Sequence, residues 1–276
     1  MFQLKRAGFY IGGDSVAGVE VKGKSKPQIL GTWRTQRGLD FNRPELLKEG
    51  LEKALTASGF RSRRISISIP DTLARTVVMD FEELPSSKKE VLEIVRARAK
   101  SEMDSAPDED VLSFQAFGQG TRKKVLCVAA KRDIIKVIEE NICQKGHSIE
   151  RVSTHSLNII NLLSADGDSA VVIRFRDYIT VIVFNGGAID FYRCKSVTDD
   201  ADVKRETAAS FAFYCGRNQG KSISKIYLID ESGRLSDLTR DSVPAPIESP
   251  GPGAFSITTG WNGRGLDLLA AAGACL

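Results

Sequence analysis

Near its N-terminus the chain reads GFYIGGDSVAGVEV, residues 8–21. Gly8 to Ile11 is a short apolar strand, and Gly12-Gly13-Asp14 has turn chemistry because glycine accepts positive φ. From Val16 to Lys22 apolar and polar residues alternate, which is typical of a strand with one buried face. The stretch therefore predicts a β-hairpin with a glycine-rich turn, and the rest of the chain can be read outward from it.

Further elements follow the hairpin. A third strand is expected over Gln28 to Arg34. Asn42 then precedes a helix in which Leu47, Leu51 and Leu55 repeat every four residues. The stretch Ile65 to Ile69 alternates isoleucine with serine and ends at Pro70, which predicts a one-sided strand.

Residues 70–147 follow a β-α-β-β-α order, like an insertion between the opening strands and a later one. A run from Leu73 to Phe81 is extended, and Ser87 with Glu90 forms a capping box before a helix to about Met103. Two strands and a second helix complete the unit, over Val111 to Phe117, Lys124 to Ala130, and Asp133 to Gly146.

The first plan recurs further along the chain. A helix over Ser153 to Leu163 leads to a meander of strands near 170–173, 179–185 and 188–193, a helix over Asp202 to Cys215, and a strand over Ile223 to Ile229. Pro244 to Gly253 is predicted as a loop, and Gly265 to Ala274 as a helix of small residues. A weak internal repeat of this kind favours two similar lobes that face each other across a cleft.

Composition narrows the function classes. The formal net charge is only +4, and two basic clusters, at residues 61–64 and 122–124, suit either a phosphate or headgroup patch or a solvated loop edge. No aromatic residues interleave with them, which argues against a nucleic-acid partner. No secretory signal and no apolar run of roughly 18 residues is seen, so direct membrane insertion is not expected. The five cysteines have no metal-ligand spacing and are expected to be reduced.

Catalytic motifs are also missing. The stretch Gly216 to Ser222 looks like a phosphate loop, but it has three residues between its glycines instead of four and lies between a helix and a strand in the reverse order. No nucleophile and base pattern stands out. The sequence therefore assigns no catalytic residue and no metal ligand.

The order and spacing of these segments resemble the actin-like ATPases, and within them the family of the type IV pilus assembly protein PilM with its type II secretion platform relatives. That family opens on a motif close to GIDIGSSSVKAVEL, which residues 8–21 match loosely. The strand ending at Pro70, the run Thr76 to Phe81 and Leu84-Pro85 before a helix follow the family order.

The resemblance implies an α/β fold of the two-lobed actin-like (ribonuclease H-like) type with an inserted β-α-β-β-α subdomain and a reduced second lobe. Its expected divisions are a first-lobe core at 1–69, the insert at 70–150, a return helix at 151–168 and a second lobe with a C-terminal helix at 169–276. Between Arg193 and Asp202 the chain has no room for the base-side subdomain of the family.

Departures from the family fall on its nucleotide site. The aspartate of the first motif is Tyr10 here, and alignment on Thr180 places Arg174 and Arg176 where the second lobe of the family has an aspartate and a glycine. The adenine-side glycine pair is reduced to Gly233 after Asp230 and Glu231. The resemblance leaves a degenerate remnant of the site, made of Gly12, Gly13, Asp14, Ser15, Thr180 and Gly233.

This pattern predicts a protein without a cofactor and without ATP hydrolysis. The alternative is an actin-like ATPase that binds ATP and magnesium in a rearranged site. A cell-division membrane tether of the same superfold is a third reading, disfavoured because no amphipathic basic helix follows the domain.

The family also implies a partner. PilM binds the cytoplasmic tail of a single-span inner-membrane protein of the PilN type, between the first lobe and the insert. On this chain the groove would be lined by Ile67, Ile69, Met79, Phe81 and Val91. The expected localisation is cytoplasmic, peripheral to the inner membrane through this partner, with contacts to other pilus or secretion platform proteins.

Overall fold

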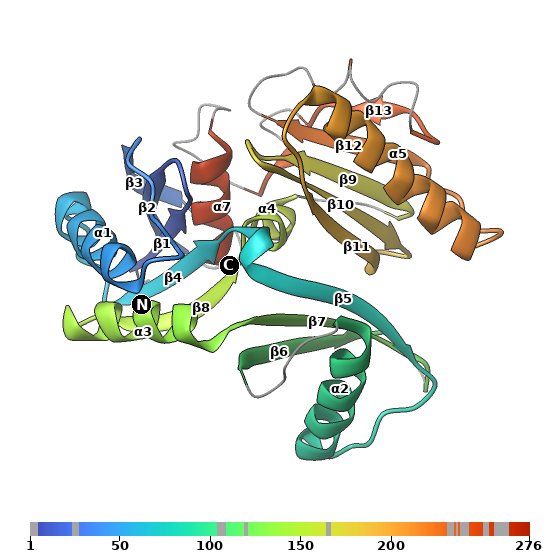
Figure 1. Cartoon of the computed structure of the whole chain (residues 1–276), viewed down its shortest axis with the longest axis horizontal. Coiled ribbons are helices and arrows are strands. Elements are labelled where there is room, and N and C mark those ends of the chain that lie inside the picture. Colours follow the sequence, from blue (N-terminus) through green and yellow to red (C-terminus); the bar gives the residue numbers. More distant parts are fainter. Residues whose placement is uncertain are drawn as a thin grey trace. The chain divides into compact units, whose positions relative to one another are not determined.

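A computed structural model of the chain describes residues 5–23, 28–103, 109–118, 121–163, 167–230, 235, 237, 243–250, 254–256 and 265–276. The chain forms two bodies (Figure 1). The first body comprises Met1–Leu73, Arg132–Ser164 and Gly251–Leu276, and the second comprises Ala74–Lys131 and Ala165–Pro250.

A five-stranded mixed sheet forms the centre of the first body, in the order β3-β2-β1-β4-β8. The hairpin that residues 8–21 predict is present, because β1 pairs antiparallel with β2 and Ile11 lies opposite Val16. The strands are β1 (Lys5–Ile11), β2 (Val16–Lys22), β3 (Gln28–Thr35), β4 (Arg64–Ile69) and β8 (Ser148–Thr154). Between β3 and β4 runs α1 (Pro44–Ser58), which begins at a proline in its first turn and ends at Gly59 with φ +64°.

Helix α3 (Arg132–Gln144) belongs to the first body and packs against α1. Its buried isoleucines face inward, and Asn141 Nδ2 donates to the Lys48 carbonyl at 3.1 Å. The sequence assigns residues 132–150 to the insert, but this packing and the parallel pairing of β8 with β4 place them with the first lobe. The inserted part of the second body is therefore β-α-β-β, without a second helix.

The C-terminal helix also differs from its predicted place. Helix α7 (Leu266–Ala274) packs against β1, β2 and α4 (His155–Leu162) in the first body, whereas the sequence places residues 265–274 in the second lobe. Close backbone approach explains the location, since a Cβ on Gly8 would lie 1.9 Å from the Ala271 carbonyl oxygen. A Cβ on Gly273 would lie 1.8 Å from that of Asn158.

Two sheets make up the second body. The insert has a three-stranded antiparallel sheet, β5-β7-β6, with α2 packed on it. Its elements are β5 (Ala74–Phe81), α2 (Lys88–Met103), β6 (Asp110–Phe117) and β7 (Lys123–Lys131), and the short 3-10 turn Asp71–Leu73 precedes them in the first body. The other sheet has the order β11-β10-β9-β12-β13.

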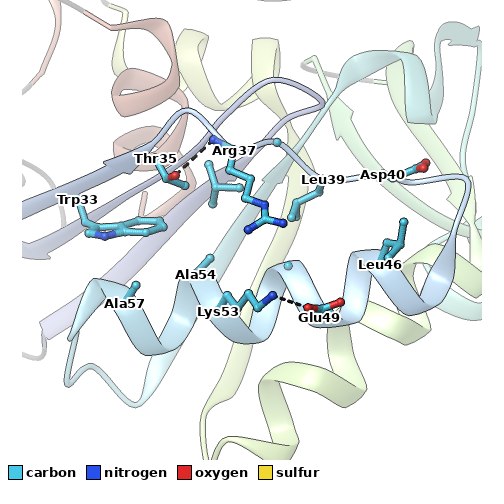
Figure 2. A pocket seen from close by; sticks show the side chains of 13 residues that line it. Trp33, Thr35, Arg37, Leu39, Asp40, Leu46, Glu49, Lys53, Ala54 and Ala57 are labelled. Carbon is cyan, nitrogen blue, oxygen red and sulfur yellow. Dashed lines mark hydrogen bonds and ion pairs between the residues drawn. The ribbon is translucent and has the colours of Figure 1, made fainter.

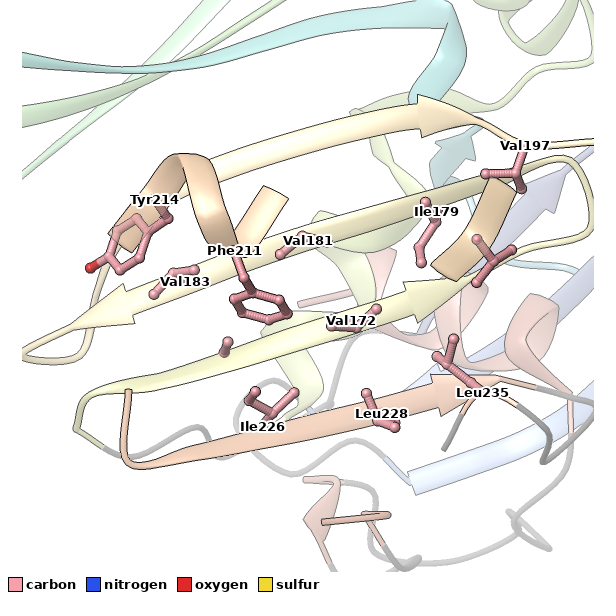
Figure 3. Packing of buried hydrophobic residues seen from close by; sticks show 12 residues of the cluster. Val172, Ile179, Val181, Val183, Val197, Phe211, Tyr214, Ile226, Leu228 and Leu235 are labelled. Atoms are coloured by element: carbon pink, nitrogen blue, oxygen red, sulfur yellow. The ribbon is translucent and has the colours of Figure 1, made fainter. Parts of the chain in front are cut away.

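That second sheet repeats the plan of the first one. Its elements are β9 (Ser169–Arg174), β10 (Tyr178–Asn185), β11 (Ala188–Ser196), α5 (Asp200–Arg217), β12 (Lys225–Asp230) and β13 (Ile247–Glu248). Side chains of the strands and of α5 meet in one apolar cluster that includes Val181, Phe211 and Leu228 (Figure 3). Residues 197–199 connect β11 to α5.

We expect Gly273→Ala to destabilise the protein by about 1–3 kcal/mol, because the added methyl group would overlap the main chain of α4. Urea unfolding followed by circular dichroism measures the change. The control is Gly216→Ala in α5, where a Cβ meets nothing within 4 Å, so the better helix propensity of alanine should raise stability by up to about 1 kcal/mol. Equal stability of Gly273→Ala and the parent would contradict the described contact of α4 with α7.

Candidate functional site

The first glycine turn is closed as a hairpin. The Gly12 amide donates to the Ser15 carbonyl at 2.9 Å, so it is not available to a ligand in this conformation. Gly13 and Asp14 are exposed, and Ser15 is buried with its hydroxyl 3.4 Å from Asp14 Oδ1. Four predicted remnant residues, Gly12 to Ser15, therefore lie together in one turn.

Two neighbours enclose this turn. The hydroxyl oxygen of Tyr10 would lie 2.6 Å from a Cβ on Gly12, so the phenol ring occupies the space beside that glycine. On another side, the Leu39 amide donates to the Gly12 carbonyl at 2.9 Å, and a Cβ on Gly38 would lie 2.1 Å from the Gly13 oxygen. The space that a phosphate-binding turn leaves open is thus partly filled by the protein itself.

A buried polar cluster supports the Tyr10 ring. The ring stacks on the imidazole of His155, with centroids 4.0 Å apart and planes at 22°. His155 Nε2 lies 3.2 Å from the Ser68 carbonyl, and Asn158 Nδ2 donates to Ser68 Oγ at 2.8 Å. Asp71 Oδ2 accepts from the Ser156 amide at 3.2 Å, where a carboxylate suits the N-terminus of α4.

Burial makes His155 a neutral side chain. It is fully buried, and burial lowers the pKa of its imidazole to about 3, although backbone hydrogen bonds to Ser68 and Ile11 act in the opposite direction. A neutral imidazole can stack on the phenol without a charge to solvate. This cluster has no local signal in the sequence, because Tyr10 and His155 are about 145 positions apart in the chain.

A cavity of about 300 Å³ lies between β3 and α1 in the first body (Figure 2). The Trp33 indole forms one wall and Leu46 and Ala54 of the helix form the other, while Leu39 lies near the turn described above. Glu49 and Lys53 form an ion pair at the rim. Because β3 is an outer strand of its sheet, this groove can accept apolar side chains from a segment that passes along the edge.

The turn between β9 and β10, which follows Arg174, is also a closed hairpin. The Phe175 amide donates to the Tyr178 carbonyl at 3.0 Å, and the two rings stack with centroids 4.7 Å apart. Arg174 forms an ion pair with Asp200, 2.6 Å between Nη2 and Oδ1. Thr180 is fully buried in β10 between Ile173 and Cys194. Gly233, the last predicted remnant residue, lies outside the described residues.

The five residues predicted for the partner groove are buried in the cores of their own bodies. Ile67 and Ile69 lie in β4 of the first body, at 0% and 2% exposure. Met79, Phe81 and Val91 form one cluster between the insert sheet and α2, together with Val95, Ala99, Val125 and Cys127. Because these side chains hold the cores, mutations in them would report on folding before they report on binding.

Sequence reasoning missed a charged cluster in the second body. The Asp190 side chain is 1% exposed, and its carboxylate lies 2.7 Å from Lys124 Nζ and 2.8 Å from Lys221 Nζ. The Tyr214 hydroxyl donates to it at 2.8 Å. Burial opposes the charged form, but these three donors outweigh it and lower the pKa of Asp190. The only sequence signal is an aspartate inside the apolar strand AIDFY.

The described residues were also compared with the requirements of a membrane-spanning helix and of a metal site. No helix in the described ranges has the length and hydropathy that a bilayer crossing needs. Within the same ranges, histidine, cysteine and carboxylate side chains do not gather in any group of three that could bind a metal ion.

We expect the free energy of unfolding to decrease as the pH is lowered, because of the titration of His155. The unfolded chain takes up a proton on this residue near pH 6.5, whereas the folded state does not until about pH 3, so acid favours unfolding between these values. The loss should approach about 1.4 kcal/mol per pH unit below 6.5. Urea unfolding between pH 7.5 and 5 should therefore give a shallower pH dependence for His155→Gln than for the parent, and equal slopes would contradict the neutral, buried assignment.

Comparison with known proteins gives matches by structure only. No protein-family model and no curated protein sequence matches the chain. A chain of the PilM-PilN type IV pilus biogenesis complex is 15% identical, with a TM-score of 0.77 over 99% of this chain and 97% of that chain.

Two further structures agree with it. The cytoplasmic domain of EpsL, an inner-membrane component of the type II secretion system of Vibrio cholerae, is 9% identical, with a TM-score of 0.57 over 98% of this chain and 94% of that chain. A Bacteroides thetaiotaomicron protein of unknown function is 11% identical, with a TM-score of 0.59 over 97% and 95%. That protein is described as having an actin-like ATPase fold. The likeness is one of fold: this chain has the α/β actin-like ATPase fold that its sequence predicts.

Proposed function

We propose that this chain is a PilM-like cytoplasmic scaffold protein of a type IV pilus or type II secretion-like assembly platform. The observation that carries the proposal is the full-length likeness to a chain of the PilM-PilN complex, which includes the insert as well as both lobes. In this role the protein binds the cytoplasmic tail of a PilN-like inner-membrane protein and remains at the membrane through that partner.

We further propose that the protein does not hydrolyse ATP. Hydrolysis on this fold needs carboxylates that hold a metal ion together with open glycine turns. Here a phenol replaces the first carboxylate and covers Gly12, and the Arg174 guanidinium replaces the second. In both turns a backbone amide, of Gly12 or of Phe175, donates to a carbonyl of the same hairpin.

Binding of the tail requires exposed apolar surface. The five residues that the sequence predicts for the groove are buried, so other exposed apolar residues are considered. The first body offers the groove beside α1, where Leu46 is 44% exposed (Figure 2). The insert offers the outer face of α2, where Ile94 is 40% exposed. Either surface can hold apolar side chains of a short peptide, so each is tested by itself.

In melting experiments we expect millimolar Mg-ATP to leave the thermal midpoint almost unchanged, and phosphate release to stay at background. A ligand present at a hundred times its Kd would stabilise the protein by about 2.7 kcal/mol, which a melt detects readily. Gly13→Arg is the control, because a Cβ at Gly13 meets nothing within 4 Å and the arginine would fill the turn without disturbing it. ATP turnover that Gly13→Arg abolishes would favour the alternative, an ATPase with a rearranged site.

For the partner, we expect a peptide of the PilN-like tail to bind the full chain, and Leu46→Asp or Ile94→Asp to weaken binding by about 2 kcal/mol if the residue is a hot spot. Phe213→Asp is the matched control, because Phe213 is 49% exposed on α5 of the second lobe. Calorimetric titration measures affinity, and circular dichroism checks that each variant is folded. Unchanged affinity in both folded variants would rule out the two proposed surfaces.

A further inference from the structure

The basic cluster at residues 122–124 lies beside a cavity that the proposed function does not use. This cavity has a volume of about 880 Å³ and lies within the second body, where the insert meets the turn between β10 and β11. It is named the insert pocket here, and its walls include Phe81, Arg98, Phe117, Arg122 and Lys123, with Gly186 of the hairpin opposite.

The three basic residues of the cluster differ in how their charges are paired. Lys124 is neutralised by two carboxylates, because its ammonium lies 2.5 Å from exposed Asp80 and 2.7 Å from the buried Asp190 side chain. Lys123 donates to the Gly118 carbonyl at 2.8 Å and keeps two further donors. Arg122 is exposed, and no described residue pairs with its guanidinium. Arg122 and Lys123 are therefore the lining cations whose charge no described carboxylate balances, whereas Arg98 pairs with Glu102.

The walls beside these cations combine aromatic rings with charged side chains. Arg98 lies over the Phe81 ring, 4.8 Å from its centroid, and donates to the Asp80 carbonyl at 2.5 Å and to Glu102 at 3.1 Å. These bonds use two of the five N–H donors of Arg98, and the ion pair with Glu102 balances its charge at this wall. Phe117 is half-buried at the end of β6 and offers a second aromatic surface.

Strand β6 leads into the pocket as an outer strand. In the described sheet it pairs with β7 alone, so its other edge carries backbone donors and acceptors that no described strand uses. An extended segment that pairs along this edge would place alternate side chains near Phe117 and Arg122. Exposed Glu82 at the rim disfavours a free phosphate dianion, whereas a peptide can keep its carboxylates at the opposite side.

We propose that the insert pocket and the edge of β6 form a docking site for an extended peptide segment with acidic side chains, whose carboxylates pair with Arg122 and Lys123. The charge of the pocket and the free strand edge both fit this occupant. The pocket lining includes neither Leu46 nor Ile94, although Arg98 lies one helical turn from Ile94 on α2, and the proposal does not rest on the proposed function.

The test uses the full chain labelled with ¹⁵N and a short acetylated peptide in which glutamate alternates with valine. We expect the peptide to shift the backbone amide signals of β6, Gly118 and Arg122, and the affinity to fall as sodium chloride is raised. Arg122→Glu should weaken the peptide by about tenfold while leaving the melting curve unchanged. The matched control is Arg61→Glu, the same charge reversal at an exposed position of the other basic cluster, which should retain the affinity of the parent.

Four results would overturn the proposal. One is the absence of shifts at β6, and another is equal binding of a peptide with glutamine in place of glutamate. The third is an equal loss of affinity in Arg61→Glu and Arg122→Glu, which would assign binding to net charge. Shifts at Arg122 from inorganic phosphate, with none from the peptide, would identify a site for a free anion and would also exclude the peptide.

Discussion

The buried carboxylate of Asp190 determines how the second body is built. A carboxylate at 1% exposure cannot stay charged without partners, and here it takes one from β7 of the insert and two from the second lobe. The ion pair with Lys124 is therefore a fixed connection between β11 and the insert, alongside the contacts of β5 with β11. The insert pocket exists at this junction because both walls are held in place there.

The glycine turns are likewise closed by groups of the protein itself. In each lobe a hairpin joins two central strands, and its backbone donors close the turn. Aromatic rings then cover the space: the phenol of Tyr10 on His155 in the first body, and Phe175 on Tyr178 in the second. In both bodies the protein itself thus fills the space beside the turn, which supports the proposal of a protein that acts by binding partners on its surface.

The repeating plan of the chain was accessible from sequence because it rests on local signals. Alternation over residues 16–22, the leucine repeat of α1 and the serine-isoleucine alternation of β4 each reflect one buried face. Strand β8 gave no such signal, since an edge position leaves Ile149 and Val152 as its main apolar residues. Assignment of α3 and α7 to their bodies also failed, because it depends on contacts between residues far apart in the chain, such as Asn141 with Lys48 and Gly8 with Ala271.

The candidate site could be predicted in part. The altered turn residues were visible in the sequence, while the burial of Ile67 and Met79 and the pairing of Asp190 became visible only in the fold.

The position of α7 has a consequence for synthesis on the ribosome. The second body has all of its residues once position 250 has emerged, but the first body, begun at the N-terminus, waits for residues 266–274. Until then the sheet face around Gly8 and the side of α4 around Asn158 have no helix to cover them. The lobe that is translated first is thus the one completed last, and during that interval its uncovered apolar face is exposed to aggregation and to chaperones.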